Sequence, residues 1–129
     1  MRVLKIATKI VFVYNADSGL VAGLKDYFHK VLRPSTYQCR LCAVTYGPLG
    51  MKGDWRRFVT HLPFGVEFLH RDEFSARFPD SREEFPAAFL VDDGGIVSKL
   101  VSAADLAGVE SLEDLKSLVE RKVREAALA

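Results

Sequence analysis

The chain has 129 residues, 49% of them hydrophobic and 27% charged, and its 18 Lys and Arg nearly balance its 17 Asp and Glu. This length predicts one globular domain over residues 1–129, with enough chain to bury a core without disulfides. A net charge of +1 excludes the broad basic surface typical of nucleic-acid-binding proteins. No apolar run approaches the roughly 20 residues that cross a bilayer, and no signal-peptide pattern opens the chain, so we expect a cytoplasmic protein that binds neither nucleic acid nor membranes.

The first third of the chain predicts a strand, a turn and a helix. Residues 9–14 form a β-branched and aromatic run that is typical of a buried strand. Four turn residues follow it: Asn15, Asp17, Ser18 and Gly19. Apolar residues then recur at helical spacing over residues 20–32, and Asp17 or Ser18 suits the N-cap of that helix.

The middle of the chain contains one ambiguous segment and one short helix. Over residues 35–46, Ser35 and Gln38 form a capping-box pattern for a helix, whereas the aromatic and β-branched residues favour a strand, so both alternatives stay open. Gly and Pro residues over 47–53 predict a loop, and Asp54 suits the N-cap of a short helix after it. The apolar residues of this helix, which we expect to point inward, are Trp55, Phe58, Val59 and Leu62.

The C-terminal third predicts a hairpin and a helix. Residues 87–91 and 96–101 are apolar runs joined by an Asp-Asp-Gly-Gly segment, whose Asp-Gly step is a strong hairpin signal. Ser111 and Asp114 then form a capping-box pattern at the start of an amphipathic helix.

Two shorter segments complete the predicted order of elements. Residues 66–69 predict a second strand, and residues 70–78 predict a helical turn. Strands separated by helices, with an antiparallel hairpin near the end, predict an α/β domain with a central mixed sheet of about four strands flanked by helices.

This order is similar to the thioredoxin-like fold, in which a strand, helix, strand half is joined through a helix to a strand, strand, helix half. The resemblance covers most of the chain and implies a cis proline at the start of the third strand, next to the active site. Pro86, which leads into residues 87–91, stands at that position. In thiol-redox members the Cys-x-x-Cys motif lies between the first strand and the first helix. Here that position holds residues 15–19, and Cys39 and Cys42 come after the first predicted helix.

Residues 14–19, 34–42 and 45–47 together also resemble a small, poorly characterised bacterial family. This second resemblance implies no mechanism.

Cys39 and Cys42 are the residues with an obvious route to covalent chemistry. A thiolate at Cys39 can attack a disulfide, and Cys42 can resolve the resulting mixed disulfide. A helical turn would bring the two thiols together, whereas an extended strand would point them to opposite faces. Arg40 between them favours the thiolate. The alternative is that both are small core residues, since free Cys is among the most buried residue types.

A zinc site would be a second use of the cysteine pair. It would need two further ligands from His29, His61 and His70, whose spacing does not match a zinc motif. We therefore expect no metal and no cofactor.

The turn at residues 15–19 is a candidate ligand-binding site. Free amides at a helix N-terminus bind carboxylate or phosphate, but capping and turn formation also explain Asn15, Asp17 and Ser18. The spacing of a phosphate-binding P-loop is not met, because only three residues separate Gly19 from Gly23.

A basic cluster lies beside an aromatic residue: Lys52, Arg56, Arg57 and Trp55. Such a cluster can bind phosphate or nucleobases, and the alternative is a solvated helix face.

Two functions remain open. The first is a cytoplasmic thiol–disulfide oxidoreductase or redox-responsive protein, with Cys39 as nucleophile, Cys42 as resolving thiol and Pro86 beside the site by resemblance. It would act on a protein thiol or disulfide, or on a small-molecule partner. The second is a non-enzymatic binding or adaptor protein that uses residues 15–19 and 47–53. Exposed, paired thiols would favour the first function, and buried, separated thiols the second.

Overall fold

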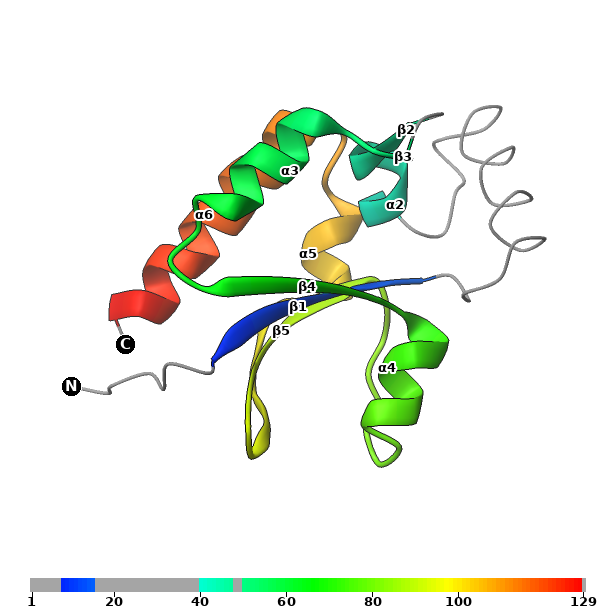
Figure 1. Cartoon of the computed structure of the whole chain (residues 1–129). Coiled ribbons are helices and arrows are strands. Elements are labelled where there is room, and N and C mark those ends of the chain that lie inside the picture. The colour runs from blue at the N-terminus through cyan, green and yellow to red at the C-terminus, as the bar shows by residue number, and fades with distance from the viewer. Residues whose placement is uncertain (1–7, 16–39, 48–49, 129) are drawn as a thin grey trace.

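The central strand of the sheet is β1 (Lys9–Tyr14), in which every residue after Lys9 is buried. The computed structural model describes residues 8–15, 40–47 and 50–128 of the chain (Figure 1). On one side β1 pairs in parallel with β4 (Gly65–His70), and on the other it pairs antiparallel with β5 (Ala87–Asp92). With β6 (Gly95–Val101) beside β5, the strand order is β4-β1-β5-β6. The predicted four-stranded mixed sheet is therefore confirmed.

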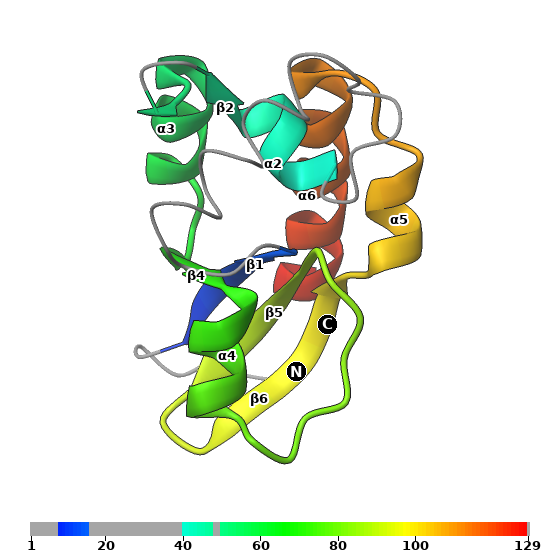
Figure 2. The same ribbon diagram turned by 90° about the vertical axis from the view of Figure 1, so that its right-hand side faces the viewer.

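Helices cover both faces of this sheet (Figures 1 and 2). On one face lie α2 (Arg40–Thr45), α3 (Gly53–Thr60), α5 (Ala103–Ala107) and α6 (Leu112–Leu128). The other face is covered by α4 (Arg71–Arg77). A two-stranded ribbon, β2 (Tyr46–Gly47) with β3 (Gly50–Met51), joins α2 to α3.

The core has two layers because the sheet is buried on both faces. Ile10, Phe12 and Tyr14 pack into the layer under α3 and α6, whereas Val11 and Val13 pack toward α4. This alternation explains why the sequence of β1 is a continuous apolar run, since a strand buried on both faces shows no polar side. From α6, one helical stripe enters the larger layer: Leu115, Val119 and Val123.

The ambiguous segment 35–46 is helical from Arg40 to Thr45, with Leu41 and Val44 buried on one face. The Oγ1 of Thr45 donates a hydrogen bond of 2.6 Å to the carbonyl of Leu41. The predicted helix over residues 20–32 lies outside the described residues.

The start of α3 corrects one prediction. Asp54 is not the N-cap, because the helix begins at Gly53 and Lys52 is the capping residue. Asp54 instead lies in the first turn, where a negative charge suits the helix dipole, and forms an ion pair with Arg57.

Two Ser-x-x-Asp patterns cap the N-termini of the C-terminal helices. Ser111 accepts a hydrogen bond of 3.1 Å from the Asp114 amide, as the capping pattern predicts. The prediction did not include α5, where Ser102 and Asp105 form a reciprocal capping box with bonds of 3.0 and 3.1 Å. Five residues are too few for a visible hydrophobic period, so only the Ser-x-x-Asp spacing signals this helix.

The predicted hairpin is confirmed. In its turn, the Asp92 carboxylate accepts a hydrogen bond of 2.8 Å from the Gly94 amide, and Gly95 has a φ of 118°. That positive φ favours glycine. Just before β5, the Phe85–Pro86 peptide bond is cis, as the thioredoxin-like resemblance implies.

Within the part of the chain that the structure describes, no helix has the length and apolar character needed to span a membrane.

A bidentate ion pair fastens α4 to β4. The Arg77 guanidinium donates two hydrogen bonds of 2.9 Å to the two carboxylate oxygens of Glu67, and the Lys9 ammonium lies 3.7 Å from one of them. The hydrogen bonds from Arg77 hold the pKa of Glu67 below its usual value of 4.5. The pair therefore stabilises the fold above that pH, and the contribution is lost as the pH falls through the lower pKa of the folded state.

We predict that Glu67→Gln lowers the free energy of unfolding by about 1 kcal/mol at pH 7, because the amide cannot carry the charge that Arg77 binds. As the pH falls from 4.5 through the lower pKa of folded Glu67, this carboxylate becomes neutral and the difference should vanish. Urea unfolding at several pH values measures this, with Glu125→Gln on the exposed face of α6 as control. A difference that does not depend on pH would contradict the prediction.

Candidate functional site

The carboxyl ends of β1 and β4 meet at one edge of the sheet. Tyr14 pairs in register with His70, and the pairing of Val13 with Ala87 brings the start of β5 beside the end of β1. Of the two neighbours of β1, β4 is parallel and ends at this edge, whereas β5 is antiparallel and begins there. In α/β sheets, ligands commonly bind outside the carboxyl ends of the strands. This end of the sheet is therefore the candidate site.

Of the four residues predicted to bind a ligand, the structure describes Asn15, which lies at this end of the sheet. The Arg71 guanidinium, from the first residue of α4, donates a partly buried hydrogen bond of 3.1 Å to its Oδ1. This bond ties α4 to the end of β1 and orients the Asn15 amide. The other three residues of the predicted turn, Asp17, Ser18 and Gly19, lie outside the described residues.

A histidine and a carboxylate form a dyad at the same end. Glu73 accepts one hydrogen bond of 2.7 Å from the backbone amide of His70 and another of 2.9 Å from its Nδ1. Because a carboxylate only accepts, the His70 ring donates the second of these hydrogen bonds. The backbone amide and then the ring of His70 hold the pKa of Glu73 below its usual range. Sequence reasoning weighed His70 only as a metal ligand, and the His-x-x-Glu spacing is the signal that marks the pair.

Pro86 is buried at this end, next to the end of β1. The helix α2 lies over the end of the sheet at which β5 begins, and it packs against α5 and α6 (Figures 1 and 2). The backbone of position 42 belongs to α2, but the Cys42 side chain and all of Cys39 lie outside the described residues. The structure thus brings Asn15 and Pro86 together and sets the helix that contains position 42 over the same end of the sheet.

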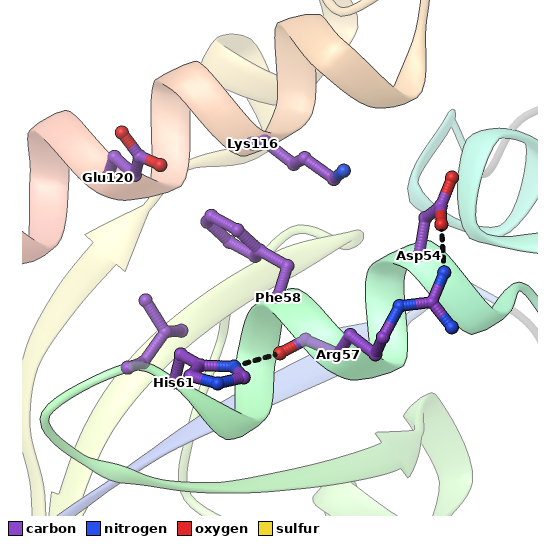
Figure 3. Close-up of a pocket in the computed structure, with 7 residues that line it drawn as sticks. Asp54, Arg57, Phe58, His61, Lys116 and Glu120 are labelled. Carbon is purple, nitrogen blue, oxygen red and sulfur yellow. Dashed lines mark hydrogen bonds and ion pairs between the residues drawn. The ribbon is translucent and has the colours of Figure 1, made fainter.

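A separate groove of about 470 Å³ lies between α3 and α6 (Figure 3). Phe58 points across it toward Lys116 and Glu120. At the end of α3, His61 is the C-cap residue, and its Nδ1 lies 2.7 Å from the Arg57 carbonyl. Because acidic and basic groups alternate along its walls, the groove selects neither sign of ligand charge.

The basic cluster does not form the aromatic platform that ligand stacking would need. Trp55 has no exposed surface, and its ring packs against Phe12 and Phe58 at centroid distances of 5.4 and 5.6 Å. Of the three cations, Arg57 is paired with Asp54. The prediction that Trp55 points into the core is confirmed. The alternative, in which its ring stacks on a bound ligand, is wrong because the ring is buried.

Within residues 8–15, 40–47 and 50–128, no three His, Cys, Asp or Glu side chains gather closely enough to hold a metal ion. Comparison with protein-family models, with curated protein sequences and with solved structures gave no match for this chain.

We predict that Trp55→Ala lowers the free energy of unfolding by about 3–5 kcal/mol, because it empties a buried aromatic site. The exposed neighbour provides the control, and Arg56→Ala should change stability by no more than about 0.5 kcal/mol. Because Trp55 is the single tryptophan, urea unfolding should be followed by circular dichroism. Equal stability of the two variants would show that Trp55 is not part of the core.

Proposed function

We propose that the chain is a thiol–disulfide oxidoreductase, or a protein that responds to redox state, on a thioredoxin-like scaffold. Support for the scaffold comes from the order of its strands and helices. A parallel pair, β1 and β4, is joined through α4 to the antiparallel pair β5 and β6, and α6 follows. The cis peptide bond before β5 is the local feature that the family resemblance implies.

The observation that carries the redox proposal is the helical start of α2 at Arg40. Residues 40–45 are helical and not extended. In a helix, residues three positions apart share one face, so a helical turn that includes Cys39 brings the two thiols together. The helix α2 lies over the end of the sheet at which β5 begins (Figure 2), and we propose that the cysteine pair works beside the cis proline that precedes β5.

The proposed reaction is disulfide exchange. The Cys39 thiolate attacks one sulfur of a substrate disulfide, which forms a mixed disulfide and releases the first substrate thiolate. The Cys42 thiolate then attacks the Cys39 sulfur and releases the second. The substrate gains two electrons, the two cysteines are oxidised to a disulfide, and solvent supplies protons to the released thiolates.

We propose the cytoplasm as the site of action and a protein thiol or disulfide, or a small-molecule disulfide, as the partner. A close cysteine pair in a chain without a disulfide framework fits a reducing compartment. In that setting the pair cycles between dithiol and disulfide.

We predict that the purified protein loses two hydrogens reversibly across a glutathione redox series, with Cys39 and Cys42 protected from alkylation together. Mass spectrometry of the alkylated protein measures this. Cys39→Ser should abolish reduction of a model disulfide, whereas Cys42→Ser should accumulate a mixed disulfide at Cys39, because the resolving thiol is missing.

Ala127→Ser, an exposed position on α6, is the matched control and should keep full activity. Thiols that stay free throughout the redox series would overturn the proposal. The binding or adaptor alternative at residues 15–19 and 47–53 would then be preferred.

A further inference from the structure

The two edge strands of the sheet differ in how they are protected against pairing. Proteins shield exposed edges with bulges, lysines or prolines, because an unpaired row of N–H and C=O groups accepts another strand. The pairing of β6 with β5 has two register shifts, and β6 carries Lys99, whose ammonium lies 2.7 Å from the Glu83 carboxylate. The β6 edge is therefore shielded.

The other edge, β4, has none of these devices. It pairs with β1 in unbroken register over all six residues and contains neither lysine nor proline. Its Glu67 faces the α4 side of the sheet, where Arg77 and Lys9 hold it. Within residues 8–15, 40–47 and 50–128, no strand pairs with the outer edge of β4. An added strand would form its hydrogen bonds with the outward backbone groups of β4.

An apolar groove of about 440 Å³ runs beside this edge, between β4 and α3. Its apolar lining comes from Met51, Val59, Phe64, Val66 and Phe68. Val66 and Phe68 are alternate residues of β4, and both pack toward the helix layer. An added strand would extend this layer, with its own alternate side chains in the groove.

A cation stands at the rim of the groove. Arg56 is exposed on α3, and no ion-pair partner for it occurs among the described residues. Its neighbour Arg57 is paired with Asp54, and Arg77 with Glu67. Arg56 therefore offers a carboxylate a charge that the fold itself does not use.

We propose that β4 and this groove bind an extended peptide segment of a partner protein. The segment adds as a strand beside β4, buries alternate apolar side chains under α3 and sets an acidic residue against Arg56. This recognition does not depend on the cysteine pair and goes beyond the redox proposal.

Charge complementarity favours a partner peptide over a second copy of this chain. Antiparallel pairing of two β4 strands would bring two Arg56-bearing α3 helices to the same face of the joined sheet. The acid of β4, Glu67, faces the opposite side and is already paired. A second copy thus supplies no β4 carboxylate to Arg56, whereas an acidic peptide does.

The test is selection of a random 12-residue peptide library on the wild-type protein, followed by fluorescence anisotropy with the synthetic peptide selected most strongly. We expect peptides with alternating apolar residues and an Asp or Glu. Arg56→Glu should weaken binding about tenfold, because it replaces attraction with repulsion. Arg124→Glu on the exposed face of α6 is the matched charge reversal and should leave binding unchanged.

Amide hydrogen exchange locates the bound peptide. Outward amides of Gly65–His70 should become protected on binding, and N-methylation of alternate peptide amides should abolish it, because strand addition needs those hydrogen bonds. Double substitution of Cys39 and Cys42 by Ser should leave the affinity unchanged, which separates this proposal from the redox function. Failure to select a binder, indifference to Arg56→Glu, or a free protein whose β4 is already protected in a dimer would each overturn it.

Discussion

Burial of β1 on both faces is the constraint on which the rest of the structure depends. When the side chains on both faces of a strand are buried, each face needs apolar partners. The backbone N–H and C=O groups also need hydrogen-bonding neighbours on both edges of the strand. The helix layer with α3 and α6 supplies one cover, and α4 supplies the other. With β4 and β5 as its neighbours, β1 ends inside the sheet, and the residue after it, Asn15, lies between the ends of two other elements.

The chemistry of the candidate site follows from this position. Because β4 runs parallel to β1, its last residue, His70, reaches the same edge, where Glu73 in the first turn of α4 orients the ring. Because β5 runs the opposite way, its beginning brings Pro86 to that edge as well. Residues far apart in the chain thus gather at one end of the sheet through strand direction, and local sequence cannot reveal their proximity.

The sequence predicts those parts of the fold whose signal is local. Residues 9–14 and the Asp-Gly hairpin carry such signals, and the structure confirms them. Residues 35–46 carry equal local signals for helix and strand, and tertiary burial of Leu41 and Val44 accompanies the helix. Proximity of Asn15 to Pro86, and the orientation of His70 by Glu73, depend on sheet register and cap geometry, so residue patterns alone miss them.

The two proposed surfaces share one strand. One end of β4 borders the apolar groove under α3, and the other end, at His70, belongs to the candidate site. A strand of six residues spans about 20 Å, so a peptide paired along the whole of β4 would reach the carboxyl edge of the sheet. In strand addition, the affinity comes mainly from hydrogen bonds between backbone groups, so many peptide sequences can bind. Such binding would suit a protein that must hold different polypeptides in one orientation, with chemistry confined to one end of the same sheet.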